Sequence, residues 1–173
     1  MTILQLPGYF FPEKAASIYL EDNRQTAFSK EGFNTIVYTP IPQRGLSEEE
    51  FRAYKKRKFE MMYDNKVEVH RFEMYREGKN PIMRALRYFL VSIIQFWKSI
   101  WVKGIDLIYV ASTPPTQGAL AALVKKIKHV PLVYNLQDIF PDSLVGANLA
   151  KKDSIAGSPR NSFRASVIND YRR

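Results

Sequence analysis

One stretch of sequence decides the expected fold: Asp106-Leu-Ile-Tyr-Val-Ala-Ser-Thr-Pro-Pro-Thr-Gln-Gly118. Its first six residues form a nearly continuous apolar run, which is typical of a strand covered on both faces. A proline-rich turn then leads into a helix that we expect over residues 116–128, and residues 131–136 form the next expected strand. Strand, helix and strand in this order predict a parallel sheet with helices packed on it.

The N-terminal part of the chain shows the same order of elements. Residues 2–6 indicate a buried strand that ends at Pro7-Gly8, residues 17–30 indicate a helix ended by Gly32, and residues 35–39 indicate a second strand. The candidate core contacts of this helix are Ile18, Leu20, Ala27 and Phe28. The two halves together predict an α/β domain built on a doubly wound parallel sheet.

The middle of the chain carries two helix-start signals. Ser47-Glu48-Glu49-Glu50 is a capping box, and we expect its helix to run to about Tyr63. Residues 66–72 alternate as a half-exposed strand does. Asn80-Pro81 then begins a long helix, with Asn as the cap and Pro at the first helical position, and Gly104 is placed to end it.

The long helix has a broad apolar stripe that we expect to pack on the sheet. Its members are Ile82, Leu86, Phe89, Leu90, Ile93, Trp97, Ile100 and Trp101. Outside the stripe, aromatic, apolar and basic residues are mixed as they are in helices that lie at a membrane surface. The candidate membrane-facing residues are Arg84, Arg87, Tyr88 and Lys98.

The composition excludes several kinds of site and indicates the charge of the partner. The 173 residues include no Cys, which excludes disulfides and thiolate zinc sites, and the only two His, His70 and His129, are far apart. The formal net charge of +9 predicts an anionic partner. We expect a membrane surface rather than nucleic acid, because the charge is dispersed and no recognition motif occurs. Without a basic leader or an apolar run of spanning length, the expected location is cytoplasmic, peripheral at the inner face of the plasma membrane.

The candidate site lies where loops leave the carboxyl ends of the strands, because open α/β sheets bind ligands there. Residues 8–17, 112–118 and 137–143 all fall at that edge. Thr113 is placed either to cap the following helix or to contact a ligand, and both uses are compatible. Asp138 directly follows a strand, so its carboxylate could orient a sugar hydroxyl or take its proton. Asp142-Ser143 could equally cap the next helix.

Two blocks carry a resemblance to a known family. Tyr9-Phe10-Phe11-Pro12-Glu13, and residues 106–118 continuing through a helix to residues 130–143, resemble family 4 glycosyltransferases of the GT-B type. The similar subgroup builds bacterial O-antigen, capsule and exopolysaccharide repeats and includes fucosaminyl-type transferases. The resemblance covers residues 1–152, which we take as an N-terminal, acceptor-side domain.

The resemblance implies a Rossmann-like domain that forms the N-terminal half of a GT-B fold. It implies a polyprenyl-diphosphate-linked acceptor on this half, and a nucleotide-sugar donor and paired glutamates on a second domain. It implies retaining sugar transfer with no metal or cofactor beyond the nucleotide-sugar. Our candidate catalytic residue is Asp138. Our candidate substrate-binding residues are Glu13, Ala15, Ser17, Thr113, Gln117, Asp142 and Ser143.

Two departures from the family pattern matter. Many relatives have a Gly-Gly pair where this chain has Lys14-Ala15-Ala16, so easy positive φ is lost in the loop. The pattern also stops near Lys152, and residues 153–173 are a tail that we expect to be disordered or frameshifted. We therefore expect a truncated transferase that lacks its donor domain and is inactive by itself. The alternative is a non-catalytic membrane-docking module or a subunit of a split glycosyltransferase.

Overall fold

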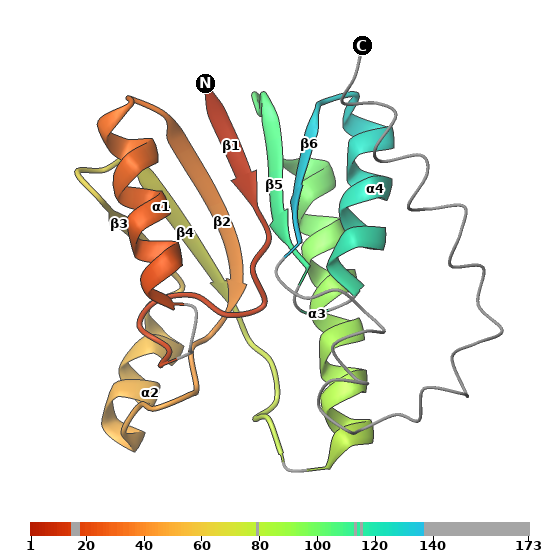
Figure 1. Ribbon diagram of the computed structural model, residues 1–173. Helices are drawn as coiled ribbons and strands as arrows, with labels where there is room; N and C mark the ends of the chain where they lie inside the picture. The colour runs from red at the N-terminus through yellow and green to blue at the C-terminus, as the bar shows by residue number, and fades with distance from the viewer. Residues whose placement is uncertain (15–17, 79, 113, 115, 137–173) are drawn as a thin grey trace, which may run out of the picture. The chain divides into compact units, whose positions relative to one another are not determined.

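The protein is described by a computed structural model, whose well-placed residues form an α/β domain (Figure 1). The described residues are 1–14, 18–78, 80–112, 114 and 116–136. A six-stranded sheet has the order β3-β4-β2-β1-β5-β6. Its strands are β1 Thr2–Gln5, β2 Asn34–Pro40, β3 Phe59–Met62, β4 Val67–Phe72, β5 Leu107–Ala111 and β6 Leu132–Asn135. The helices are α1 Ile18–Lys30, α2 Glu48–Lys56, α3 Pro81–Trp101 and α4 Thr116–Lys128.

The sheet is mixed and mostly parallel, which corrects the expectation of an all-parallel sheet. Strands β4, β2, β1, β5 and β6 are parallel neighbours, whereas β3 pairs antiparallel with β4. The capping box at Ser47 is confirmed, but its helix ends at Lys56 rather than near Tyr63. Tyr63, Asp64 and Asn65 all have positive φ, a conformation that Asp and Asn tolerate, and this turn folds β3 back onto β4.

Helices lie on both faces of the sheet. Because side chains alternate along a strand, Leu4 of β1 points to one face and Gln5 points to the other. Leu6, which follows the strand, lies in the same apolar core as Leu4. The leucine face packs against α4 in the main apolar core. The opposite face meets α1, where Gln25 Nε2 donates to Gln5 Oε1 at 2.5 Å. The two faces of the domain are therefore chemically different, one apolar and one partly polar.

The expected core contacts of α1 are wrong in part. Leu20 and Ala27 are exposed, Ile18 and Phe28 are half-buried, and the fully buried residue of this helix is Gln25. The sheet face beneath α1 presents Gln5 and Tyr109, so polar side chains of the helix find hydrogen-bond partners there. A buried polar group with a partner avoids the desolvation cost of an unpaired one.

The predicted packing of α3 is also wrong. Its buried residues are Arg87, Val91, Ser92, Gln95 and Ser99. Most of the apolar stripe is exposed instead, namely Ile82, Leu86, Phe89, Ile93, Trp97 and Trp101. The polar face turns inward because the ends of β1 and β2 offer backbone carbonyls, which Gln95 satisfies. No helix within the described part of the chain is both long and apolar enough to cross a membrane.

Candidate functional site

Two of the three predicted loops meet at the carboxyl edge of the sheet. β1 and β5 are parallel neighbours, so the chain leaves both strands at the same edge. A Cβ atom added at Gly8 would lie 2.8 Å from Cδ of Pro114, which shows how closely the two loops approach. The third loop, residues 137–143, lies outside the described residues. The contact between the first two loops is where we place the candidate site.

Gln95 of α3 connects the loops behind this edge. Its Nε2 donates to the carbonyl oxygen of Pro7 at 2.9 Å and to that of Tyr38 at 2.8 Å. Its Oε1 accepts a hydrogen bond from Nε2 of Gln117 at 2.7 Å. Gln117 is a predicted substrate-binding residue, and its side chain is fully buried. In this structure Gln117 therefore holds the strand ends in place through Gln95.

A second tie joins α3 to the start of α4. Ser92 Oγ lies 2.7 Å from Thr116 Oγ1 and 3.0 Å from the carbonyl oxygen of Tyr88. This pair satisfies both hydroxyls at a site where the two helices touch. The first turn of α4 is thus fixed relative to α3, and with it the turn that follows β5.

Glu13 anchors the loop that follows β1. It is only 2% exposed, and its Oε1 accepts from the backbone N–H groups of Gln43 at 2.8 Å and Arg44 at 3.1 Å. Burial raises the pKa of Glu13, although the two N–H groups and the charges of Arg87 and Arg44 oppose that shift. Glu13, another predicted substrate-binding residue, here ties this loop to the one that follows β2.

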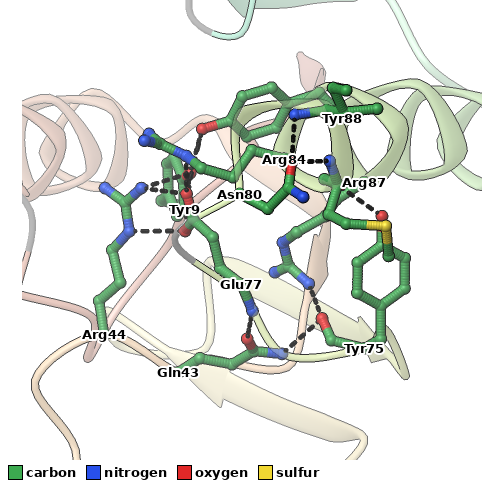
Figure 2. Close-up of polar contacts among 11 residues, drawn as sticks. Tyr9, Gln43, Arg44, Tyr75, Glu77, Asn80, Arg84, Arg87 and Tyr88 are labelled. Atoms are coloured by element: carbon green, nitrogen blue, oxygen red, sulfur yellow. Dashed lines mark hydrogen bonds and ion pairs between the residues drawn. The ribbon is translucent and has the colours of Figure 1, made fainter.

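Beside this anchor lies a polar cluster of Tyr9, Arg44, Glu77, Arg84 and Tyr88, which we call the tyrosine–arginine cluster (Figure 2). Arg44 binds both carboxylate oxygens of Glu77, at 2.7 and 2.9 Å, and Nε of Arg84 reaches Oε1 at 2.9 Å. The hydroxyl of Tyr9 accepts from Arg44 at 2.8 Å and lies 2.8 Å from the hydroxyl of Tyr88. Three loops and α3 therefore converge on one carboxylate.

The electrostatics of this cluster leave an excess of positive charge. Burial alone would raise the pKa of Glu77, but hydrogen bonding and charge from Arg44, together with the charge of Arg84, hold it below its usual value. Burial and the hydrogen bond with Tyr88 raise the pKa of Tyr9. At neutral pH the cluster holds one carboxylate, two guanidinium groups and the neutral hydroxyl of Tyr9. It can face an anion, such as a phosphate, with donors that are already positioned.

A cavity of about 480 Å³ opens next to the cluster. Its charged lining comes from Arg44, Arg84 and Glu77 of the cluster and from Arg76 paired with Glu48 at 2.6 and 2.8 Å. The size falls within the range of small-molecule pockets. Three guanidinium groups against two carboxylates make its wall cationic.

The predicted membrane-facing residues have different surroundings. Arg84 is partly exposed at the tyrosine–arginine cluster, and Tyr88 is half-buried within it. Lys98 places its Nζ 5.6 Å from the ring centroid of Tyr38. The prediction for Arg87 is wrong, because this residue is 2% exposed and its guanidinium donates to the carbonyl oxygen of Tyr75 (Figure 2). The buried guanidinium is stabilised there by this carbonyl oxygen and by the charge of Glu13.

The remaining predicted site residues lie outside the described part of the chain, as does the tail over residues 153–173. They are Ala15, Ser17, Thr113, Asp138, Asp142 and Ser143. The sequence interpretation missed Arg44 and Glu77, although both follow the carboxyl ends of strands, β2 and β4. The rule that selected the loops after β1 and β5 would have found them if it had been applied to every parallel strand.

Comparison with known proteins does not assign the chain to a family. No protein-family model and no curated protein matches this chain. Within the described residues, no group of three or more His, Asp or Glu side chains is arranged to hold a metal ion. The function is therefore inferred from the residues and geometry of the carboxyl edge.

Proposed function

We propose that this chain is the acceptor-side, Rossmann-like domain of a family 4 GT-B glycosyltransferase. The reaction transfers a sugar from a nucleotide-sugar to a polyprenyl-diphosphate-linked saccharide in bacterial surface polysaccharide synthesis, at the inner face of the plasma membrane. One observation carries the proposal: the two loops with the family-like sequence, at Gly8 and Pro114, touch at the carboxyl edge of a parallel sheet. This is the edge at which open α/β sheets bind ligands.

The tyrosine–arginine cluster supports an acceptor that carries a diphosphate. Guanidinium groups recognise phosphate oxygens by paired, charge-assisted hydrogen bonds. Arg44 and Arg84 already have their side chains ordered by Glu77, so little side-chain entropy is lost when an anion binds beside them. The Tyr9 hydroxyl adds a neutral hydrogen-bonding group at the same place.

In the proposed reaction, an acceptor hydroxyl oxygen bonds to the anomeric carbon as the bond from that carbon to the nucleotide diphosphate breaks. The hydroxyl proton passes to a base, and Asp138 remains our candidate for orienting the hydroxyl or taking that proton. The nucleotide-sugar and the groups that stabilise its leaving diphosphate would come from a second domain. Turnover therefore requires that domain, whereas acceptor binding does not.

Acceptor binding can be tested on the chain as it is. The probe is N-acetylglucosamine linked through a diphosphate to a short citronellyl chain, titrated by calorimetry, with citronellol-linked N-acetylglucosamine as the uncharged control. We expect the Arg84→Gln substitution to weaken binding by about tenfold, because one charge-assisted contact is lost. The matched control is Arg52→Gln, on exposed α2. Equal affinity for the two ligands, or an unaffected Arg84→Gln variant, would contradict the proposal.

A further inference from the structure

The exposed side of α3 is unusually apolar. A continuous stripe runs along the helix, and we call it the apolar face of α3: Ile82, Leu86, Phe89, Ile93, Trp97 and Trp101. Ile82 is 76% exposed, Trp97 58% and Trp101 77%. Contiguous apolar surface of this kind marks an interaction site in soluble proteins.

Helix α4 extends this surface. It packs beside α3 and adds Leu123 and Ile127, which are also exposed (Figure 1). Between the helices lies a groove of about 450 Å³, lined mainly by apolar residues such as Phe96 and Leu120. Its hydroxyls, from Ser92 and Thr116, bond to each other at 2.7 Å. The groove therefore offers hydrocarbon surface and satisfied polar groups, rather than a set of free hydrogen-bond donors.

The charged residues of the two helices all have one sign. Neither α3 nor α4 contains a single Asp or Glu, although the chain has 17 acidic residues. Lys103, two residues after Trp101, and Lys126, next to Ile127 on α4, are exposed. An apolar stripe with Trp, accompanied by lysines, is the composition of helices that lie in the interface of an anionic bilayer.

We propose that the apolar face of α3, together with α4, docks on an anionic phospholipid bilayer with the tryptophans at headgroup level. Charge complementarity selects this occupant. In a symmetric pair of copies the lysines of one chain would face those of the other, whereas anionic headgroups neutralise them. The inference rests on the proposed function for its biological setting, since a lipid-linked acceptor is reached from a membrane surface.

The geometry fits a helix lying parallel to the membrane. The 21 residues of α3 span about 31 Å at 1.5 Å per residue, and the stripe follows its whole length. Two members of the tyrosine–arginine cluster, Arg84 and Tyr88, are on the same helix, on another side than the stripe. Docking by this face would therefore place the cluster about one helix diameter, roughly 10–12 Å, from the headgroups.

The chain supplies its own reporter, because Trp97 and Trp101 are its only two tryptophans. The probe is a vesicle of equal parts phosphatidylcholine and phosphatidylglycerol, without lipid-linked sugar. We expect a blue shift of tryptophan fluorescence, quenching by brominated acyl chains, and about tenfold weaker binding to vesicles of phosphatidylcholine alone.

Paired substitutions on α3 and on α1 test whether vesicle binding depends on the apolar face of α3 or on any exposed apolar surface. The Ile82→Gln/Phe89→Gln pair keeps both tryptophans, and we expect it to weaken vesicle binding by about tenfold or more, because two exposed apolar contacts are lost. The matched control is Tyr19→Gln/Leu20→Gln on α1, whose side chains are exposed to a similar degree. We expect this control to bind vesicles as the unmodified chain does.

Two outcomes would overturn the inference. One is vesicle binding without a tryptophan shift, which would mean that another surface docks. The other is a blue shift that depends on protein concentration without vesicles, with a dimer in sedimentation velocity, which would assign the face to a second copy. The vesicles carry no diphosphate-linked sugar, so the two proposals can fail separately. A chain that binds vesicles but not the citronellyl probe would contradict only the proposed function. A chain that binds the probe but not vesicles would contradict only the bilayer inference.

Discussion

Replacing Gln95 by Leu tests the element that holds the candidate site together. Leu has a similar size but removes both donor contacts, to the carbonyl oxygens of Pro7 and Tyr38, and the acceptor for Gln117. Each hydrogen bond contributes about 1 kcal/mol net to the free energy of unfolding, and a buried polar group left without its partner costs about 1–3 kcal/mol. We therefore expect a loss of about 4 kcal/mol, a large share of the 5–15 kcal/mol typical of a domain.

The assay is urea unfolding followed by tryptophan fluorescence and circular dichroism, with equal slopes required before free energies are compared. A loss of about 4 kcal/mol corresponds to a Tm lower by roughly 10–15 °C in a domain of this size. The control is Ser99→Ala, one turn along α3, which removes a hydrogen bond only to its own helix. We expect that control to cost less than about 1 kcal/mol.

A double-mutant cycle with Gln117→Leu makes the reasoning refutable. Because the two glutamines bond to each other, the double variant should cost about 1–2 kcal/mol less than the sum of the single variants. Strict additivity would show that this bond contributes nothing. A Gln95→Leu variant within about 1 kcal/mol of the unmodified chain would refute the role of Gln95 at the strand ends.

Three further predictions concern stability. The raised pKa of Glu13 means that the folded chain binds this proton more tightly than the unfolded chain does. The free energy of unfolding should therefore fall as the pH rises from 4.5 through the raised pKa. We expect Glu13→Gln to reduce this pH dependence, measured by urea unfolding at several pH values. Ser47→Ala removes the capping box with Glu50 and should cost about 1 kcal/mol, seen as faster amide exchange in α2. Gly32→Ala, at φ +76°, should cost about 1 kcal/mol in urea unfolding, whereas Gly78→Ala should cost little, since both sites have open space but only Gly32 needs positive φ.

Local sequence signals were enough for much of the fold. The helix over residues 116–128, the capping residues Ser47 and Asn80, and five parallel strands agree with the structure to within a few residues. The hairpin of β3 and β4 was missed because charged residues continue the helical pattern past Lys56. The Asp64-Asn65 turn was the available signal for the reversal.

The orientation of α1 and α3 could not be predicted from periodicity. A pattern analysis assumes that the apolar side of a helix meets the core. In α3 that assumption fails, because the inward side must supply donors to Pro7 and Tyr38, whose carbonyl groups are distant in sequence. The candidate site shows the same limit: Arg44 and Glu77 are 33 residues apart and come together only in the folded chain.

The most direct test of the proposed function is to map acceptor binding on the isotope-labelled full chain by amide chemical shifts. Titrated with citronellyl-diphosphate N-acetylglucosamine, the largest shifts should fall on the amides of Gly8, Tyr9 and Arg44, at the carboxyl edge and the tyrosine–arginine cluster. The largest shifts at the opposite edge, around Gly104, or no shifts at saturating probe, would contradict an acceptor site at the carboxyl ends of these strands.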